Sequence, residues 1–387
     1  MEKHLHIISY TVPYPPDHGG LYDVFYKLKA LHAKGVHIHL HCFDYGRGEQ
    51  PILNQYCDTV QYYQRFTGHK GISVSLPYIV ASRKNEELLQ NLLKDNHPIL
   101  MEGVHCTYPL MDERFKERDC FVRLHNVEYQ YYHDLCQQAN SAFRKLYYKR
   151  ESIMLRAYER KIASKAIFLG MTEADNTVYM HEFGANHIEQ LPLFVPDNWT
   201  VEEKQGYGTY CLYHGDLRID ANEKAATWLL EKVFSKTDIP FVIAGHHPSE
   251  KLYELAHSME HTCLVADPSE REMQDMIAKA QINILPSYTN TGIKIKLVNA
   301  VFNGRHCLVN DATAKHSGLE STCHLADSSI DFIEKIETLF SQPFSKEETE
   351  KRKLLTGELF PNDRSVIKVM RTIWKFDPVY NGMKVNP

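Results

Sequence analysis

The sequence predicts an α/β protein with two parallel-sheet domains, on three observations. The chain of 387 residues is too long for one ordinary hydrophobic core. In both halves, short apolar runs alternate with helical patterns, which is typical of parallel sheets covered on both faces. Between them, the prolines and turn residues of 191–204 interrupt all periodicity. We therefore expect domains at 1–193 and 194–361, followed by a last helix in 362–387 that returns to the first domain.

The first domain opens with a strand, a glycine loop and a helix. An apolar run at 5–9 is followed by the loop TVPYPPDHGG and by a helical pattern at 21–33, as in a Rossmann-like half. Gly19 and Gly20 would let the backbone approach a ligand closely, because neither carries a Cβ. Their spacing is not G-x-G-x-x-G, so they do not specify a dinucleotide, and a plain turn is the alternative.

The alternation then continues through the rest of the first domain. His37, His39 and His41 share one face of a strand at 36–43, where a polar strand face explains them without a metal, and we assign them no function. Further strands are predicted at 60–63, 99–102, 120–125 and 166–171, and helices at 86–94, 129–164 and 173–183.

One histidine lies where such sheets bind ligands. The run FVRLHN carries His125 to the carboxyl end of its strand, which is the edge where ligands of parallel sheets sit. A histidine that caps the next helix is the alternative. His105 follows the preceding strand and occupies an analogous position with weaker support.

The second domain repeats the pattern and contains the stretch SYTNTGIKIKLVNAVFNGRHCLVN. Strands are predicted at 210–214, 241–244, 262–265, 282–285 and 307–309, and helices at 221–233, 270–280 and from 293 onward. Gly292 stands at the entrance of that last helix, and Lys294 and Lys296 follow in its first turn. Open N–H groups and two ammonium groups predict a cradle for a phosphate or diphosphate; an ordinary helix start with two solvated lysines is the alternative. Arg218 could meet the same anion or lie on the surface.

Composition excludes several classes of function. A net charge of −5 gives no general attraction to nucleic acid. The nine cysteines are odd in number and contain no C-x-x-C pair, which argues for reduced thiols in the cytoplasm and against a zinc site. We expect no signal peptide, and no apolar run approaches the ~18 residues of a membrane span. The stretch from Arg144 to Lys165 is basic and amphipathic, so it either contacts an anionic membrane surface or forms a solvated face over the core.

Five motifs, in order and spacing, make the chain similar to a known family. They are PYPPDHGG, VRLHNVEY, YHGDLRIDANEKAATWLL, IAGHHPSEKL and LPSYTNTGIKIKLVNAVFNGRHCLVN. In them the sequence resembles, over nearly its whole length, the retaining GT-B glycosyltransferases of family 4. The resemblance implies two Rossmann-like domains facing each other across a cleft, with a C-terminal helix crossing back. It also implies metal-independent transfer of a sugar, with retention, from a nucleoside-diphosphate sugar to a hydroxyl acceptor, without a bound cofactor.

The same resemblance assigns roles to residues. His125 would contact the transferred sugar, and Arg218 and Lys296 would neutralise the diphosphate. The other implied donor contacts are Gly19, Gly20, Gly215, Gly245, Val265, Thr291, Gly292, Ile293, Lys294 and Asn299. The acceptor would be a saccharide or lipid-linked saccharide of envelope polysaccharide synthesis, in the cytoplasm or at the inner face of the membrane.

Two positions depart from the family pattern. Where the family has two glutamates separated by seven residues, this chain has Thr291 and Asn299. Asn299 can still accept a hydrogen bond from a ribose hydroxyl, but without the strength of a carboxylate. We interpret the chain as a divergent subgroup with altered donor contacts. A catalytically impaired nucleotide-sugar-binding protein and a GT-B-fold sugar-nucleotide epimerase are the alternatives.

Overall fold

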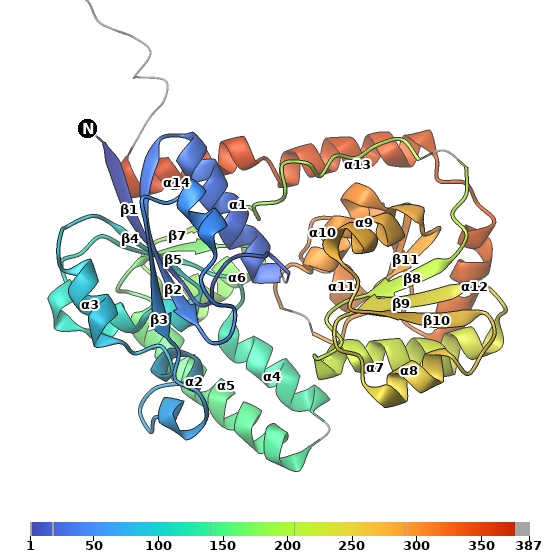
Figure 1. Ribbon diagram of the computed structural model, residues 1–387, viewed down its shortest axis with the longest axis horizontal. Coiled ribbons are helices and arrows are strands. Elements are labelled where there is room, and N and C mark those ends of the chain that lie inside the picture. Colours follow the sequence, from blue (N-terminus) through green and yellow to red (C-terminus); the bar gives the residue numbers. More distant parts are fainter. Residues whose placement is uncertain (1, 18, 140, 205, 290, 376–387) are drawn as a thin grey trace, which may run out of the picture. The chain divides into compact units, whose positions relative to one another are not determined.

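The structure, a computed structural model, describes residues 2–17, 19–139, 141–204, 206–289 and 291–375. The chain forms two compact units (Figure 1). The first comprises Met1–Tyr132, Lys149–Asp197 and the segment that begins at Phe360; the second comprises His133–Tyr148 and Asn198–Leu359.

A seven-stranded parallel sheet with the order β3-β2-β1-β4-β5-β6-β7 forms the centre of the first unit. Its strands are β1 (Lys3–Ser9), β2 (Val36–Asp44), β3 (Thr59–Gln64), β4 (Ile99–Glu102), β5 (Cys120–Arg123), β6 (Ile167–Gly170) and β7 (Ile188–Gln190). Its helices are α1 (Gly19–Ala33), α2 (Tyr78–Ala81), α3 (Glu86–Leu92), α6 (Glu173–Thr177) and α14 (Asn362–Trp374). Helices α4 (Glu128–Gln138) and α5 (Ala142–Ile162) belong to it only in part, because the second unit includes His133–Tyr148.

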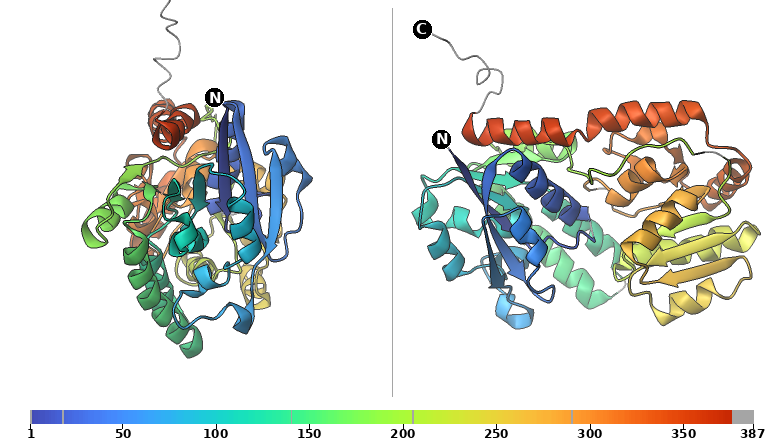
Figure 2. Two further views of the ribbon diagram at one scale, coloured as in Figure 1. Left: turned by 90° about the vertical axis from the view of Figure 1, so that its left-hand side faces the viewer. Right: turned by 45° about the horizontal axis from the view of Figure 1, so that its top comes forward.

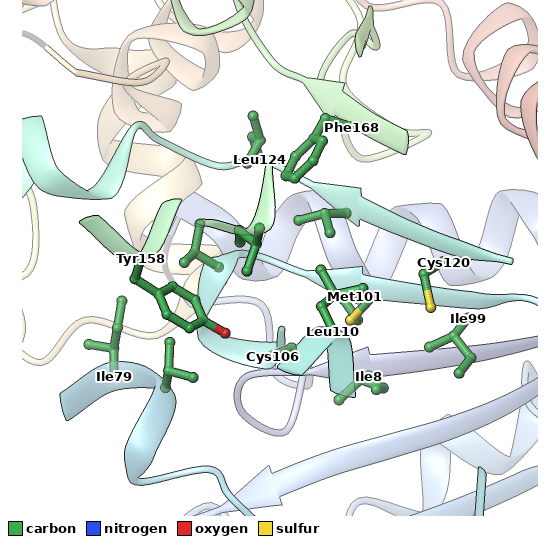
Figure 3. Packing of buried hydrophobic residues seen from close by; sticks show 14 of the residues in the cluster. Ile8, Ile79, Ile99, Met101, Cys106, Leu110, Cys120, Leu124, Tyr158 and Phe168 are labelled. Carbon is green, nitrogen blue, oxygen red and sulfur yellow. The ribbon is translucent and has the colours of Figure 1, made fainter. Parts of the chain in front are cut away.

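Alternation along the strands divides the side chains of this sheet between two cores. Leu5 and Ile7 of β1 point toward α1 and α14, which share one core with them. The opposite face packs on α2, α3 and α5, and Figure 3 shows part of this second core, including Met101 of β4 and Tyr158 of α5. The hydroxyl group of Tyr158 lies 2.9 Å from that of Thr107, so the buried phenol is satisfied.

The C-terminal helix α14 packs beside α1, as predicted (Figure 2). Val366, Val369, Met370 and Ile373 form its buried face. The side chain of Asn362 forms hydrogen bonds with the backbone of Val195. These bonds fix the start of the helix near the end of the segment Lys149–Asp197.

The second unit contains a six-stranded parallel sheet with the order β10-β9-β8-β11-β12-β13. Its strands are β8 (Cys211–His214), β9 (Phe241–Gly245), β10 (Thr262–Ala266), β11 (Ile282–Ile284), β12 (His306–Val309) and β13 (His324–Leu325). Its helices are α7 (Asp220–Trp228), α8 (Glu250–Ala256), α9 (Glu270–Lys279), α10 (Ile295–Asn303), α11 (Asp311–Ala314), α12 (Ser329–Phe340) and α13 (Lys346–Leu359). One core, shared by α7, α8 and α12, covers one face of this sheet.

The structure corrects some predicted elements. The single helix expected at 129–164 is wrong, because α4 and α5 are separate; the amide of Lys145 bonds to the carbonyl of Ser141, which starts a new helix there. The sequence did not predict β7, β13, α8, α12 and α13. Among the described helices, none has the length and apolar character that crossing a bilayer requires.

Candidate functional site

Lys296 lies at the start of α10, above the end of β8 in the second unit. Its ammonium nitrogen lies 3.3 Å from Oδ1 of Asn222 and 3.5 Å from the hydroxyl oxygen of Tyr213. The same nitrogen is 4.8 Å from the centre of the Tyr213 ring, which is cation–π distance. Among the described residues, no carboxylate lies within ion-pair distance of it. The positive charge is therefore held only by neutral groups.

Burial lowers the pKa values of two side chains here, Lys296 and His214. Burial, together with the nearby charge of Lys294, lowers the pKa of Lys296 from 10.5 to about 7. Burial and the charge of Lys296 likewise lower the pKa of His214, at the end of β8, to about 3. An anion beside Lys296 would favour its charged form, so this position is prepared for a negative ligand.

Arg218 follows β8 and is connected to Lys296 through Asn222. The Asn222 side chain donates to the carbonyl oxygen of Asp216, and the Asp216 carboxylate receives the Arg218 guanidinium at 2.6–3.1 Å. The Arg218 side chain is 55% exposed, so it lies at the surface of the unit. The sequence pointed to Arg218 and Lys296, but not to the asparagine and aspartate that join them.

The loop before α10 has the special backbone that the sequence suggested. Gly292 has φ +65, a left-handed conformation that favours glycine. Lys294 is the N-cap of α10, and no side chain caps the helix there. The Lys294 ammonium bonds to the carbonyl of Thr291 instead of pointing away from the loop. The hydroxyl group of Thr291 is buried and has no hydrogen-bond partner among the described residues, and Ile293 is partly buried beside it.

The other predicted donor contacts of this unit lie along the same strand ends. Oδ1 of Asn299 already accepts a hydrogen bond from Asn303 at 2.8 Å, one turn further along α10. A Cβ on Gly245 would collide with the Gly215 carbonyl, so these two glycines allow the ends of β8 and β9 to pack closely. Val265, near the end of β10, is 36% exposed.

In the first unit, His125 lies just beyond β5 and bonds to the end of β4. Its Nε2 is 3.2 Å from Oε2 of Glu102. Although burial alone would raise the pKa of Glu102, the charge of Lys27 and the His125 hydrogen bond lower it. The carboxylate therefore accepts and Nε2 of His125 donates, which leaves a lone pair on Nδ1.

Nδ1 of His125 faces the start of α1. It is buried and has no partner among the described residues. A Cβ on Gly20 would lie 3.2 Å from it and would collide with the hydroxyl group of Tyr10. The absence of a side chain at Gly20, next to Gly19 at the first position of α1, thus lets the start of the helix pack closely against Tyr10 and His125.

Glu102, the hydrogen-bond partner of His125, belongs to a buried ionic network. Lys27 lies 2.9 Å from carboxylate oxygens of both Asp23 and Glu102, and Arg123 binds Asp23 at 2.8 and 3.0 Å. All four side chains are fully buried. Two negative and two positive charges balance, so the network can be buried without an additional ion. Asp23, Glu102 and His125 are close enough together to hold a metal, but the two cations already neutralise the carboxylates.

His105 occupies the analogous position after β4, beside a buried acid pair. Its Nδ1 has no hydrogen-bond partner among the described residues and lies 3.9 Å from Oε1 of Glu128. Burial and the charge of Glu159 raise the pKa of Glu128 to about 8. Glu159 accepts from the backbone amides of Glu128 and Tyr129, and burial raises its own pKa to about 7. The sequence contained a signal for Glu102 and Arg123, which end otherwise apolar strands, but none for Glu128 and Glu159, which lie in helices.

The basic stretch from Arg144 to Lys165 corresponds largely to α5. Arg144 pairs with Asp220 at 2.5 Å and Arg156 with Glu182 at 2.6 Å, so part of its charge is neutralised within the protein.

Comparison with known proteins adds evidence on the family. The model of the family "Glycosyl transferases group 1" matches residues 208–342. A protein of Klebsiella pneumoniae described as "Uncharacterized 44.6 kDa protein in cps region" is 25% identical over 323 residues, which cover 77% of this chain and 80% of that protein.

Solved structures with the same fold are similar over almost the full chain. Sucrose-phosphate synthase from Thermosynechococcus elongatus has a TM-score of 0.71 at 12% identity and covers 99% of this chain and 100% of its own. Staphylococcus aureus TarM, solved with fondaparinux, α-GlcNAc-glycerol and UDP, has a TM-score of 0.65 at 11% identity, with 96% and 100% covered. Anabaena HepE, solved with UDP and glucose, has a TM-score of 0.65 at 10% identity, with 97% and 100% covered. At these identities the likeness concerns the fold, which is GT-B.

Proposed function

We propose that this protein transfers a sugar from a nucleoside-diphosphate sugar to a hydroxyl acceptor with retention. The match of residues 208–342 to the glycosyl transferases group 1 model and the GT-B fold support this proposal. One observation carries the proposal: the ammonium group of Lys296 is enclosed by neutral groups at the uncapped start of α10. An uncompensated enclosed cation beside a helix N-terminus is complementary to a diphosphate.

In this reaction the diphosphate leaves while positive charge develops on the sugar. Lys296 and the first-turn amides of α10 would stabilise the leaving group, and Arg218 would contribute when its guanidinium turns from Asp216 to a phosphate oxygen. Removing one such contact should cost about 2–4 kcal/mol of transition-state stabilisation. No protein base is assigned, because the donor phosphate can take the acceptor proton.

His125 is proposed to hold a hydroxyl group of the transferred sugar. Its Nδ1 is an acceptor without a partner among the described residues, and Glu102 fixes the ring in the tautomer that keeps this lone pair available.

The proposed donor contacts are neutral where the family that the sequence resembles uses glutamates. The hydroxyl group of Thr291 has no partner among the described residues and is available to a donor hydroxyl. Oδ1 of Asn299 must either share its lone pairs with Asn303 or exchange partners. We therefore expect a weaker hold on the ribose than a carboxylate gives.

The context supports a saccharide acceptor. The Klebsiella pneumoniae relative is described as lying in a cps region, and TarM and HepE were solved with UDP, so a UDP-sugar and an envelope polysaccharide precursor are the first candidates. All nine cysteines are unpaired, which supports a reducing cytoplasmic setting. Exposed Phe143 and Leu146 on basic α5 would allow peripheral contact with a membrane that carries a lipid-linked acceptor.

The test is a panel of UDP-, GDP- and ADP-sugars with saccharide and lipid-linked acceptors. Donor consumption is followed by release of the nucleoside diphosphate, and the anomeric configuration of the product by NMR. Transfer with retention, reduced about 30-fold or more in both Lys296→Ala and Arg218→Ala, is the expected result. Wild-type turnover in both variants would overturn the assignment of the diphosphate site.

A nucleotide-sugar-binding protein without transferase activity is the second candidate. The neutral pair Thr291 and Asn299 favours it, because both carboxylates of the family pattern are missing. Calorimetry that shows donor binding, with no transfer or hydrolysis across the panel, would support this alternative.

A further inference from the structure

Three potential metal ligands from separate elements meet at the amino end of β12 in the second unit. They are His306, the first residue of β12, His324, the first residue of β13, and Glu348 in the first turn of α13. We call them the β12–β13–α13 triad. Their ligand atoms all lie within 4.8 Å of one another. The triad lies at the opposite edge of the sheet from the strand ends that carry Lys296, so the proposed sugar transfer does not account for it.

The protein fixes His306 so that one nitrogen can act as a ligand. Its ring is fully buried, and Nε2 donates to the carbonyl oxygen of Gln342 at 3.1 Å. Nδ1 must then carry the lone pair, and it has no hydrogen-bond partner among the described residues. A hydrogen bond from the second ring nitrogen to a carbonyl is how proteins orient a metal-binding imidazole.

The carboxylate of Glu348 is held in a similar way. Its Oε2 accepts from the backbone amide of Ser345 at 3.2 Å, which leaves Oε1 directed at both imidazoles. Among the described residues, no lysine or arginine lies within ion-pair distance of Glu348. Arg352, one turn along α13, donates instead to the carbonyls of Ala300, Val301 and Gly304.

The spacing within the triad suits an ion better than a shared proton. Oε1 of Glu348 lies 3.6 Å from Nδ1 of His306 and 3.6 Å from Nε2 of His324. Both separations exceed the usual 2.7–3.2 Å or so of an N–H···O hydrogen bond. Ligand atoms at about 2.0–2.2 Å around a tetrahedral zinc ion are about 3.3–3.6 Å apart, which matches these two separations. The two imidazole nitrogens lie within 4.8 Å of each other and would have to reach the same spacing.

Ring orientation separates this triad from the other histidine cluster of the chain. His4, His39 and His97 stack with interplanar angles of 7–15°, and Nδ1 of His4 lies 3.2 Å from Nε2 of His39, so a hydrogen bond already joins these two nitrogens. The rings of His306 and His324 are inclined by 62°, which allows their lone pairs to converge. A nitrogen lone pair lies in the plane of its ring, so two rings stacked in separate parallel planes cannot both direct a lone pair at one ion.

We propose that the β12–β13–α13 triad binds a divalent transition-metal ion, with zinc as the best fit, and that this ion fastens the short edge strand β13 and helix α13 to β12. Two imidazoles and one carboxylate suit zinc and its first-row neighbours, whereas Mg²⁺ and Ca²⁺ prefer oxygen ligands alone. A water molecule would complete a tetrahedron at the solvent side, where the His324 side chain is 32% exposed. The site contains no cysteine, so the argument from cysteine spacing does not bear on it.

The test uses the full chain without a histidine tag, stripped with a chelator and titrated with Zn²⁺ in the calorimeter. His324→Gln and Glu348→Gln are the test variants, because both keep polar side chains at partly exposed positions and a glutamine at 348 can still accept from Ser345. His39→Gln is the matched control in the stacked cluster. Circular dichroism and the melting temperature without metal establish that each variant is folded.

We expect tight binding of one equivalent of Zn²⁺ by the wild type and by His39→Gln, with a rise in melting temperature. Each test variant should bind at least tenfold more weakly and lose the thermal shift, since even a change behind a ligand costs roughly 10–100-fold. Wild-type affinity in both test variants, or loss of binding in His39→Gln alone, would overturn the proposal. If the wild type binds no equivalent of Zn²⁺ tightly, the proposal is also overturned, and the three residues form an ion-pair cluster only.

Discussion

Replacing Lys296 by methionine should affect stability and ligand binding in opposite directions. Methionine keeps most of the apolar stem but removes the ammonium group, whose polar contacts within the described part of the chain are Tyr213 and Asn222. Burial lowers the pKa of Lys296 from 10.5 to about 7, and each pKa unit corresponds to about 1.4 kcal/mol. The charged form therefore costs the folded state on the order of 3–5 kcal/mol. After loss of the two polar contacts, we expect a net gain of about 1–3 kcal/mol at pH 6.

The sign of the pH dependence follows from the lowered pKa. Between pH 7 and 10.5 the unfolded chain keeps the Lys296 proton while the folded chain has released it, so wild-type stability rises with pH in this window. The methionine variant lacks this contribution, and its advantage should be smaller at pH 9 than at pH 6. Urea unfolding at both pH values measures the difference.

Binding of a nucleoside diphosphate should weaken in the same variant. The lost charge-assisted contact is worth about 1.5–3 kcal/mol, or about 10–150-fold in dissociation constant. In the wild type, the affinity should fall as the pH rises above 7, because the ligand favours the protonated lysine. Calorimetry with UDP, GDP and ADP provides the assay, and Lys279→Met, at an exposed position of α9 where the lysine pairs with Asp275, is the control. A Lys296→Met variant that is less stable than the wild type at pH 6, or that binds as tightly, would refute the reasoning.

Three further changes test the first unit. Asp23→Ala leaves Arg123 and Lys27 without their shared carboxylate and should cost about 3–5 kcal/mol in urea unfolding, whereas a loss below 1 kcal/mol would contradict the buried network. Gly20→Ala places a Cβ against the Tyr10 hydroxyl and next to His125; we expect about 1–3 kcal/mol of destabilisation and slower turnover, measured in parallel on one preparation. The pKa of Glu128 is raised from 4.5 to about 8, so its contribution to stability is lost as pH rises through that range; Glu128→Gln should flatten the decline, and an unchanged pH profile would argue against it.

Much of the fold could be predicted because each strand carries its own signal. Leu5 and Ile7 repeat with the period of a strand, and the run that ends at Glu102 is apolar throughout its length. Strand β13 has two residues and β7 has three, which is too short for any periodicity to appear. Helix α13 has a polar sequence whose buried positions are Thr349, Arg352 and Thr356, so an apolar pattern could not reveal it.

The residues of the candidate site also fall into two groups, those with a local sequence signal and those that only the fold brings together. Lys296, Gly292 and His125 could be selected because their roles depend on local position, at a helix start or a strand end. Asn222 and Tyr213, which contact Lys296, come from segments more than seventy residues away in sequence, and only the folded sheet brings them together. The same holds for the triad proposed to bind zinc, whose members derive from three elements of which two were not predicted.

The two units differ in whether their buried charges are neutralised within the protein. This difference indicates what each unit contributes to donor binding. In the first unit, Asp23 and Glu102 are matched by Lys27 and Arg123, so the network is complete without a ligand and leaves one neutral acceptor, Nδ1 of His125. Such a network orients a substrate but gains little from an added charge. In the second unit, the charge of Lys296 has no counterpart among the described residues, so it is relieved either by loss of the proton or by an incoming anion. We therefore expect the second unit to supply most of the binding energy for a diphosphate, whereas Nδ1 of His125 in the first unit can contribute a hydrogen bond to a neutral group.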